Sequence, residues 1–86
     1  MKIIYRKSFV KNFKKKDSFI KQRFLDRQRI FMVNKFDMIL NNHTLSGELS
    51  GCRSLNITGD VRAIYEEISE NHFEFISLGT HSELYE

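Results

Sequence analysis

The chain lacks proline and tryptophan, and its 86 residues include only four glycines and one cysteine. This scarcity of chain breakers argues against extended disorder. The single Cys52 excludes an intramolecular disulfide and offers no cysteine pair to a metal ion. The three histidines, His43, His72 and His81, are far apart in the sequence, so we expect no metal site.

Long apolar runs and targeting signals are also missing. No apolar run reaches the roughly 18 residues that a membrane span requires, and the basic N-terminus lacks the apolar segment of a signal peptide. We therefore expect a cytoplasmic protein without membrane contact. No glycine-rich phosphate loop is present, and we expect no cofactor. The length suits one domain, 1–86, whose core draws on an apolar fraction of 41% and on eight phenylalanines.

Charge is divided unevenly along the chain. Residues 1–36 hold twelve Lys and Arg against two Asp, whereas residues 37–86 hold two Arg against nine Asp and Glu. A basic half of this density is typical of proteins that bind nucleic acid. Solvated faces of surface helices give the same pattern, so charge alone leaves both interpretations open.

Hydrophobic periodicity predicts two helices near the N-terminus, after a short strand at 2–5. Phe9 and Phe13 give the first helix one apolar edge, and Ser8 is its expected N-cap. The second helix is expected over 19–40, with Ser18 as its N-cap and Asn41-Asn42 at its end. This helix is expected to be buried along two apolar stripes. One stripe is Ile20, Phe24 and Phe31, and the other is Leu25, Met32, Phe36 and Ile39.

Three strands are expected in the second half, over 52–57, 61–68 and 72–78, after a loop at 43–51. The order β-α-α-β-β-β predicts an α+β domain. Two N-terminal helices would pack on a small, mainly antiparallel, twisted sheet.

The hairpin at 54–65 has a predictable register around its turn at 58–60. A two-residue turn would mix charged and core residues on one face. A three-residue loop gives one mostly apolar face, so burial favours it. This register places Asn56 opposite Arg62 on the other face, where Ile64 is a misplaced apolar residue.

Four polar residues could carry chemistry. His81 follows Gly79-Thr80 at a strand end, and an imidazole exchanges protons near neutral pH, although a plain surface histidine would look the same. Arg62 suits phosphate, but a salt bridge with a nearby carboxylate would also explain it. Asp60 in the turn and His43 in the glycine-containing loop are equally ambiguous. Residue types alone therefore indicate an RNA-directed protein, catalytic or not.

Three segments, HTLSGELSGCR (43–53), SLNITGDVRAIY (54–65) and LGTHSELY (78–85), resemble the YafQ-like branch of the RelE/ParE toxin superfamily. The shared pattern is His-x-Leu-x-Gly, Gly-x-Arg, Asp-x-x-x-Ile-Tyr and Gly-Thr-His-Ser-Glu-Leu-Tyr, in that order. The N-terminal half matches only in its strand and two basic helices. The resemblance implies a RelE-like fold and a type II toxin–antitoxin toxin that cuts mRNA on the ribosome until a cognate antitoxin silences it.

The chemistry that the resemblance implies is attack of a ribose 2′-OH on the adjacent phosphate, with the 5′-oxygen leaving. It needs a base, an acid and positive charge on the phosphate. By position, His81 is implied as the principal acid/base, Asp60 and His43 as further active-site residues, and Arg62 as the phosphate contact. Asn56, Tyr85 and Arg53 are implied in substrate binding, Tyr85 by stacking on a base.

Three positions depart from the family pattern. Relatives often carry a second histidine, an arginine and an aromatic residue where this chain has Asn56, Ser77 and Val61. Asn cannot transfer protons and Ser cannot balance phosphate charge, though Arg62 could replace the arginine. We expect a ribosome-dependent mRNA endoribonuclease. The alternatives are a ParE-type toxin that inhibits gyrase without catalysis, and an RNA-binding relative with weak activity.

Overall fold

The sheet has the strand order β1-β5-β4-β3-β2, in which β1 runs parallel to β5 and the other neighbours are antiparallel. The structure is a computed structural model that describes residues 1–85. Its strands are β1 (Lys2–Tyr5), β2 (His43–Thr44), β3 (Arg53–Asn56), β4 (Val61–Ser69) and β5 (His72–Thr80). Its helices are α1 (Lys7–Lys15), α2 (Ser18–Val33), α3 (His81–Tyr85) and the 3-10 turns η1 (Met38–Leu40) and η2 (Gly47–Leu49). The predicted α+β class is confirmed.

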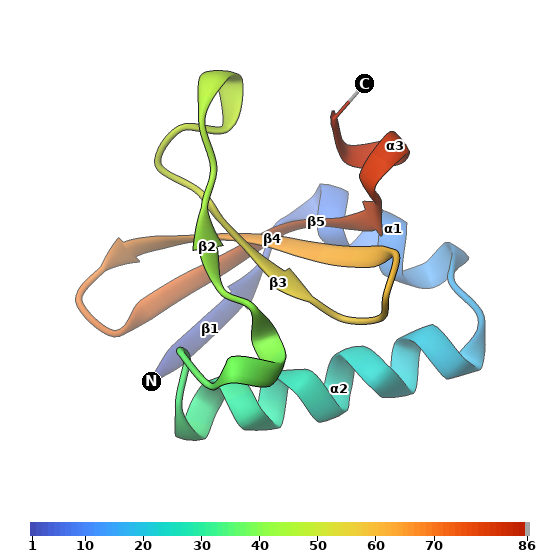
Figure 1. Cartoon of the computed structure of the whole chain (residues 1–86), viewed down its shortest axis with the longest axis horizontal. Helices are drawn as coiled ribbons and strands as arrows, with labels where there is room; N and C mark the ends of the chain where they lie inside the picture. The colour runs from blue at the N-terminus through green and yellow to red at the C-terminus, as the bar shows by residue number, and fades with distance from the viewer. Residues whose placement is uncertain (86) are drawn as a thin grey trace.

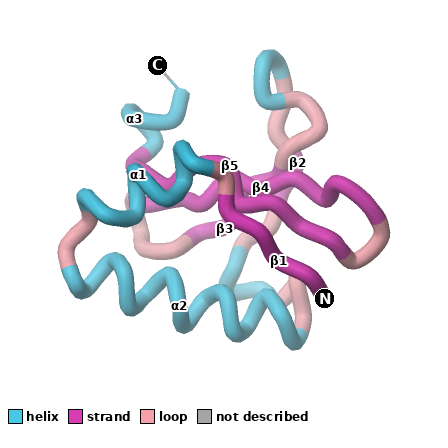
Figure 2. The backbone as a smooth tube through the Cα atoms, turned by 180° about the vertical axis from the view of Figure 1, so that it is seen from behind, coloured by secondary structure: helices cyan, strands magenta, loops and turns pink. Residues whose placement is uncertain are grey.

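Helix α2 lies on one side of the sheet, and η2 and α3 project on the other, as Figure 1 and the reverse view in Figure 2 both show. Aromatic rings fill the space between the helices and the sheet. Phe24 of α2 meets Phe75 of β5 edge-on, with 5.3 Å between ring centroids, and Phe31 meets Tyr65 of β4 at 5.0 Å. Edge contacts of this kind add to the apolar burial. The main core therefore lies on the helix side.

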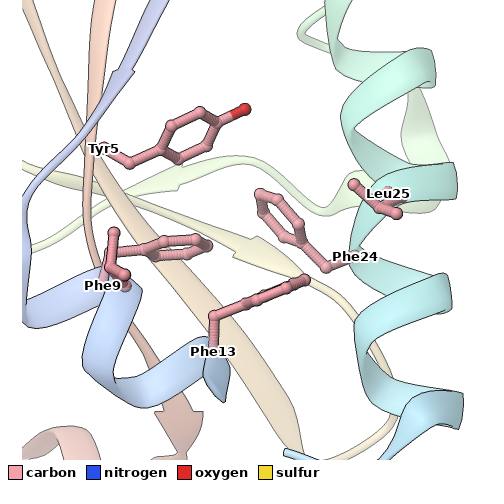
Figure 3. A pocket seen from close by; sticks show the side chains of 6 residues that line it. Tyr5, Phe9, Phe13, Phe24 and Leu25 are labelled. Carbon is pink, nitrogen blue, oxygen red and sulfur yellow. The ribbon is translucent and has the colours of Figure 1, made fainter.

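An apolar groove of about 290 Å³ opens at the edge of this core. Figure 3 shows Tyr5, Phe9 and Phe13 facing Phe24 and Leu25 of α2 across it. Within residues 1–85, the one titratable side chain that lines it is Tyr5, whose hydroxyl donates to Gln28 and whose pKa is raised by burial. The groove therefore offers no acid–base chemistry near neutral pH.

The hairpin has the predicted three-residue loop and register. Ile57 N donates to Val61 O at 2.9 Å, and Asn56 lies opposite Arg62. Ile64 is fully buried but belongs to the face away from the main core, where it pairs with Ser54. A second, smaller buried region therefore exists on that face, which explains the apolar residue that did not fit the pattern.

The second helix is shorter than predicted and ends at Val33 rather than at residue 40. The Asn34 side chain accepts a hydrogen bond from Phe36 N at 3.1 Å, and the Asp37 side chain accepts one from Ile39 N at 3.1 Å and starts η1. These local bonds compete with the helix and stop it. The second predicted stripe is not buried, because Leu25, Met32, Phe36 and Ile39 are all exposed, the first two within α2 itself.

The predicted serine N-caps and the asparagine helix end are also wrong. Asp17 caps α2, because its side chain accepts a hydrogen bond from Ile20 N at 2.9 Å. Arg6 precedes α1 without a side-chain cap, and the Ser8 hydroxyl donates to a carbonyl of β5 instead. Asn41, with φ 44°, ends η1 and not α2.

The strand β2, the turn η2 and the helix α3 were not predicted. The expected loop at 43–51 contains β2 and η2, and the strand that was expected to end at 78 runs to Thr80 and continues into α3. Strand β2 extends the sheet at one edge, and η2 and α3 lie beside its open face. Within residues 1–85 no helix is long and apolar enough to cross a membrane, and no three His, Cys, Asp or Glu side chains are grouped to hold a metal ion.

Candidate active site

A hollow of about 350 Å³ lies on the face of β3 and β4 that points away from the main core. We call it the site hollow. It is lined by Asn41, His43, Leu45, Ser46, Ser54, Arg62, His81 and Tyr85. It brings together four of the seven residues that the sequence suggested for the site, from segments up to 42 positions apart. The four are His43, Arg62, His81 and Tyr85.

His43 stands on β2, opposite Ser54 of β3. Its ring nitrogen Nδ1 lies 2.8 Å from the carbonyl oxygen of Asn41. A carbonyl oxygen only accepts, so this contact requires a proton on Nδ1. In the neutral ring the lone pair is then on Nε2, and among residues 1–85 no hydrogen bond occupies that atom. His43 is therefore oriented as a proton acceptor.

Arg62 reaches the site hollow from β4. Its Nη1 donates to the carbonyl oxygens of Thr58 and Gly59, each at 3.1 Å, which fixes the guanidinium against its own turn. None of the ion pairs formed within residues 1–85 includes Arg62, so the salt-bridge interpretation has no support there. A guanidinium has five N–H donors, and those on Nε and Nη2 are left for a ligand.

His81 and Tyr85 come from α3, which a capping box holds at its start. The Glu83 carboxylate accepts a hydrogen bond from Thr80 N at 2.8 Å, and Thr80 Oγ1 accepts one from Glu83 N at 3.2 Å. Lys16 adds an ion pair to Glu83 at 3.0 Å. These contacts, the Thr80 amide first, lower the pKa of Glu83 to about 2. The carboxylate therefore remains charged throughout the physiological range.

Gly79 allows α3 to pack this closely against the end of β5. A Cβ at this position would lie 3.0 Å from Glu83 Oε1 and 3.2 Å from Glu83 Cβ. Once α3 is placed, the rings of His81 and Tyr85 pack on each other with 4.6 Å between centroids. His81 is exposed, and no residue among 1–85 hydrogen-bonds its ring, so it is accessible to a ligand in the site hollow.

Ser54 is a site residue that the sequence did not reveal. It is fully buried, lines the site hollow, and its hydroxyl has no hydrogen-bond partner within residues 1–85. A buried hydroxyl without a partner costs about 1–3 kcal/mol. The β2–β3 pairing places Ser54 beside His43. This position is the one sign that a ligand would hydrogen-bond the Ser54 hydroxyl.

Three suggested site residues lie outside the site hollow. Asp60 is exposed in the hairpin turn, where Thr58 Oγ1 and not the Asp60 side chain accepts from the backbone. Asn56 is opposite Arg62 as expected, and its side-chain oxygen is buried without a hydrogen-bond partner in the described part of the chain. The third, Arg53, points to the helix side.

Arg53 takes part in a polar network that anchors the segment before His43. Its Nε donates to Asn42 Oδ1 at 2.7 Å, and Asn42 Nδ2 donates to Tyr65 Oη at 2.8 Å. The guanidinium also stacks on Phe36, 5.3 Å from the ring centroid. This geometry assigns Arg53 a structural role in holding the chain next to His43.

Comparisons with known proteins identify this fold. The YoeB/ParE toxin from Agrobacterium tumefaciens has a TM-score of 0.78 at 22% identity, covering 94% of this chain and 99% of that one. YafQ from E. coli strain BL21(DE3) gives 0.74 at 21%, covering 98% and 97%. YafQ from the E. coli DinJ–YafQ complex gives 0.71 at 23%, with the same coverage. These similarities show that this chain has the fold of bacterial toxins from toxin–antitoxin systems.

The family itself is established by sequence. The family model described as the bacterial toxin of type II toxin–antitoxin system, YafQ, matches residues 1–86. The chain therefore belongs to the YafQ toxin family. Comparison with curated protein sequences gives no match.

Proposed function

We propose that this toxin is a ribosome-dependent endoribonuclease that cleaves mRNA by attack of a ribose 2′-OH on the neighbouring phosphate. The observation that carries the proposal is the site hollow, which gathers two histidines and one arginine. Two imidazoles supply a base and an acid, and the guanidinium supplies positive charge for the phosphate.

The histidines divide the proton transfers. His43 accepts the 2′-OH proton on Nε2, the lone-pair nitrogen that the Asn41 contact leaves available. The 2′-oxygen then bonds to phosphorus, and the bond from phosphorus to the 5′-oxygen breaks. A protonated His81 gives its proton to that leaving oxygen. The products are a 2′,3′-cyclic phosphate and a free 5′-OH, so atoms and charge balance.

Arg62 stabilises the charge that develops on the phosphate oxygens. Its Nη1 is already bound to the turn carbonyls, so the guanidinium is oriented before the substrate arrives. The departures at Asn56 and Ser77 do not remove a required group in this scheme. Asp60 lies in an exposed turn and takes part in no proton transfer in this scheme.

The partners that we propose are a cognate antitoxin, mRNA and the ribosome, in the cytoplasm. The DinJ–YafQ structure pairs a related toxin with such a partner. The basic first half supports contact with RNA, because α1 carries exposed lysines at 7, 11, 14 and 15. Lys16 links that helix directly to α3 and hence to the site hollow.

The proposal is tested by mapping transcript ends after expression, and by incubating purified protein with mRNA in the presence and absence of ribosomes. His81→Ala and Arg62→Ala are expected to lose at least about a hundredfold in cleavage. Glu70→Ala is the control, because this exposed residue lies in the turn between β4 and β5, outside both the site hollow and the basic half. Intact transcripts with wild-type protein would overturn the proposal. A DNA-damage response would then indicate a toxin that inhibits gyrase. RNA binding without cleavage would indicate an RNA-binding relative with weak activity.

A further inference from the structure

A second cavity, of about 330 Å³, adjoins the site hollow. We call it the side cavity. It is lined by Ser46, Glu48, Leu49, Leu84 and Tyr85. Ser46 and Tyr85 line the site hollow as well, so the two spaces meet around the Tyr85 ring. Its walls come from η2 and α3, which Figure 1 shows projecting on the same side of the sheet.

The chemistry of the side cavity is opposite to that of the site hollow. Among residues 1–85, its lining includes no cationic side chain and one carboxylate, Glu48. Glu48 is exposed, and it belongs to none of the ion pairs within residues 1–85. A carboxylate repels phosphate, whereas Leu49, Leu84 and Tyr85 offer apolar and aromatic contact. The side cavity therefore suits a flat, uncharged group that carries N–H donors.

The loop that carries Glu48 is closed by backbone hydrogen bonds. Ser50 N donates to Gly47 O at 3.1 Å, and Cys52 N donates to Leu49 O at 2.9 Å. Gly47 has φ +68°, a conformation that glycine adopts without strain. The position of Glu48 is thus set by the loop and does not depend on a partner for its side chain.

We propose that the side cavity binds the nucleobase beside the cleaved phosphate and that Glu48 selects guanine. This inference rests on the ribonuclease function proposed above. A base can stack on the Tyr85 ring while its phosphate occupies the site hollow. Guanine offers two adjacent donors, its ring N–H and its amino group, to the two carboxylate oxygens. Uracil places its one N–H between two carbonyl oxygens, which a carboxylate repels.

Binding of free mononucleotides tests this without catalysis. Wild-type protein is titrated with GMP, AMP and UMP, and amide shifts of residues 46–49 are followed by NMR. We expect GMP to bind about tenfold more tightly than UMP. Glu48→Gln should lose that preference and favour AMP, because an amide pairs one acceptor and one donor with adenine. Glu70→Gln, an exposed site in the turn between β4 and β5, is the control with the same charge change.

The two proposals fail in different ways. Equal affinities for GMP and UMP, or a GMP preference that survives in Glu48→Gln, would overturn the side-cavity inference even if RNA is cleaved. A GMP preference that is lost in Glu48→Gln would support the side cavity. If that same protein left RNA intact on ribosomes, the endoribonuclease function alone would fall.

Discussion

Lys16 and Glu83 join the two halves of the chain at the site, with 3.0 Å between Lys16 Nζ and Glu83 Oε1. Lys16 follows the last residue of α1, and Glu83 lies in α3 between His81 and Tyr85. The basic half of the sequence therefore holds the short helix that carries two residues of the site hollow. Since the same carboxylate caps α3, one side chain controls where His81 lies.

Replacing Glu83 should disturb catalysis more than folding. Glu83→Ala removes both the cap and the ion pair, so we expect about a 10- to 100-fold loss in kcat from misplacement of His81. Glu83→Gln keeps an acceptor for Thr80 N and should lose less. Single-turnover cleavage and thermal unfolding measure the two effects. An equal, small effect of both substitutions on kcat would contradict this role.

The same contact predicts how α3 responds to acid. The pKa of Glu83 is lowered to about 2, so the capping contact is complete above the ordinary glutamate pKa of 4.5 and is lost as the pH falls through about 2. The Thr80 amide resonance should therefore move in that acidic window in an NMR titration. The Glu83→Gln variant should show no such transition. In the wild-type protein, a transition near the ordinary glutamate pKa of 4.5 would be inconsistent with the contact.

Ser54→Ala should separate stability from activity. The hydroxyl is buried without a partner within residues 1–85, so its removal should leave stability unchanged or raise it by about 1 kcal/mol. If the hydroxyl binds substrate in the site hollow, kcat/KM should fall at the same time. Ser77→Ala, at a half-buried position on β5, is the comparison. Loss of stability with full activity would show that Ser54 is structural.

The two histidines should give a bell-shaped pH profile of cleavage rate. Loss of the base, in His43→Ala, should remove the acidic limb, and loss of the acid, in His81→Ala, should remove the basic limb. Single-turnover rates across the pH range measure this. If both variants lost the same limb, the division of proton transfers would be wrong.

The aromatic core should carry much of the stability. Phe31 is fully buried and meets Tyr65, Phe73 and Phe75. Phe31→Ala should cost about 3–5 kcal/mol in the free energy of unfolding, measured by urea denaturation. Phe19→Ala, at a residue that is 59% exposed, should cost far less. Similar losses in both would contradict the assignment of the core.

The local pattern of apolar and polar residues predicted those parts of the fold that are determined by the burial of apolar side chains. The hairpin register followed from the alternation of apolar and polar residues, because a shift by one residue would expose the core. The end of α2 did not follow from pattern, since Asn34 and Asp37 override a favourable apolar period through their own hydrogen bonds. The predicted burial of Phe36 and Ile39 failed for the same reason, since both residues lie beyond the end of α2.

The site was predictable as a set of residue types and not as an arrangement. His43 and His81 line one hollow because β2 pairs with β3 and because Glu83 caps α3. The β2–β3 pairing has no strong sequence signal, whereas Thr80-His81-Ser82-Glu83 matches the capping-box pattern. Family resemblance suggested both histidines without showing that they share a hollow. Ser54 could not be found from the sequence, because a missing hydrogen-bond partner exists only in the folded chain.

The most direct test of the endoribonuclease is the chemistry of the RNA ends that it leaves. Purified protein is incubated with ribosomes and mRNA, and the fragments are analysed by mass spectrometry. The proposed mechanism predicts a 2′,3′-cyclic phosphate on one fragment and a free 5′-OH on the other, with neither formed by His81→Ala. A 5′-phosphate at the cut, or intact mRNA with the wild-type protein, would contradict it.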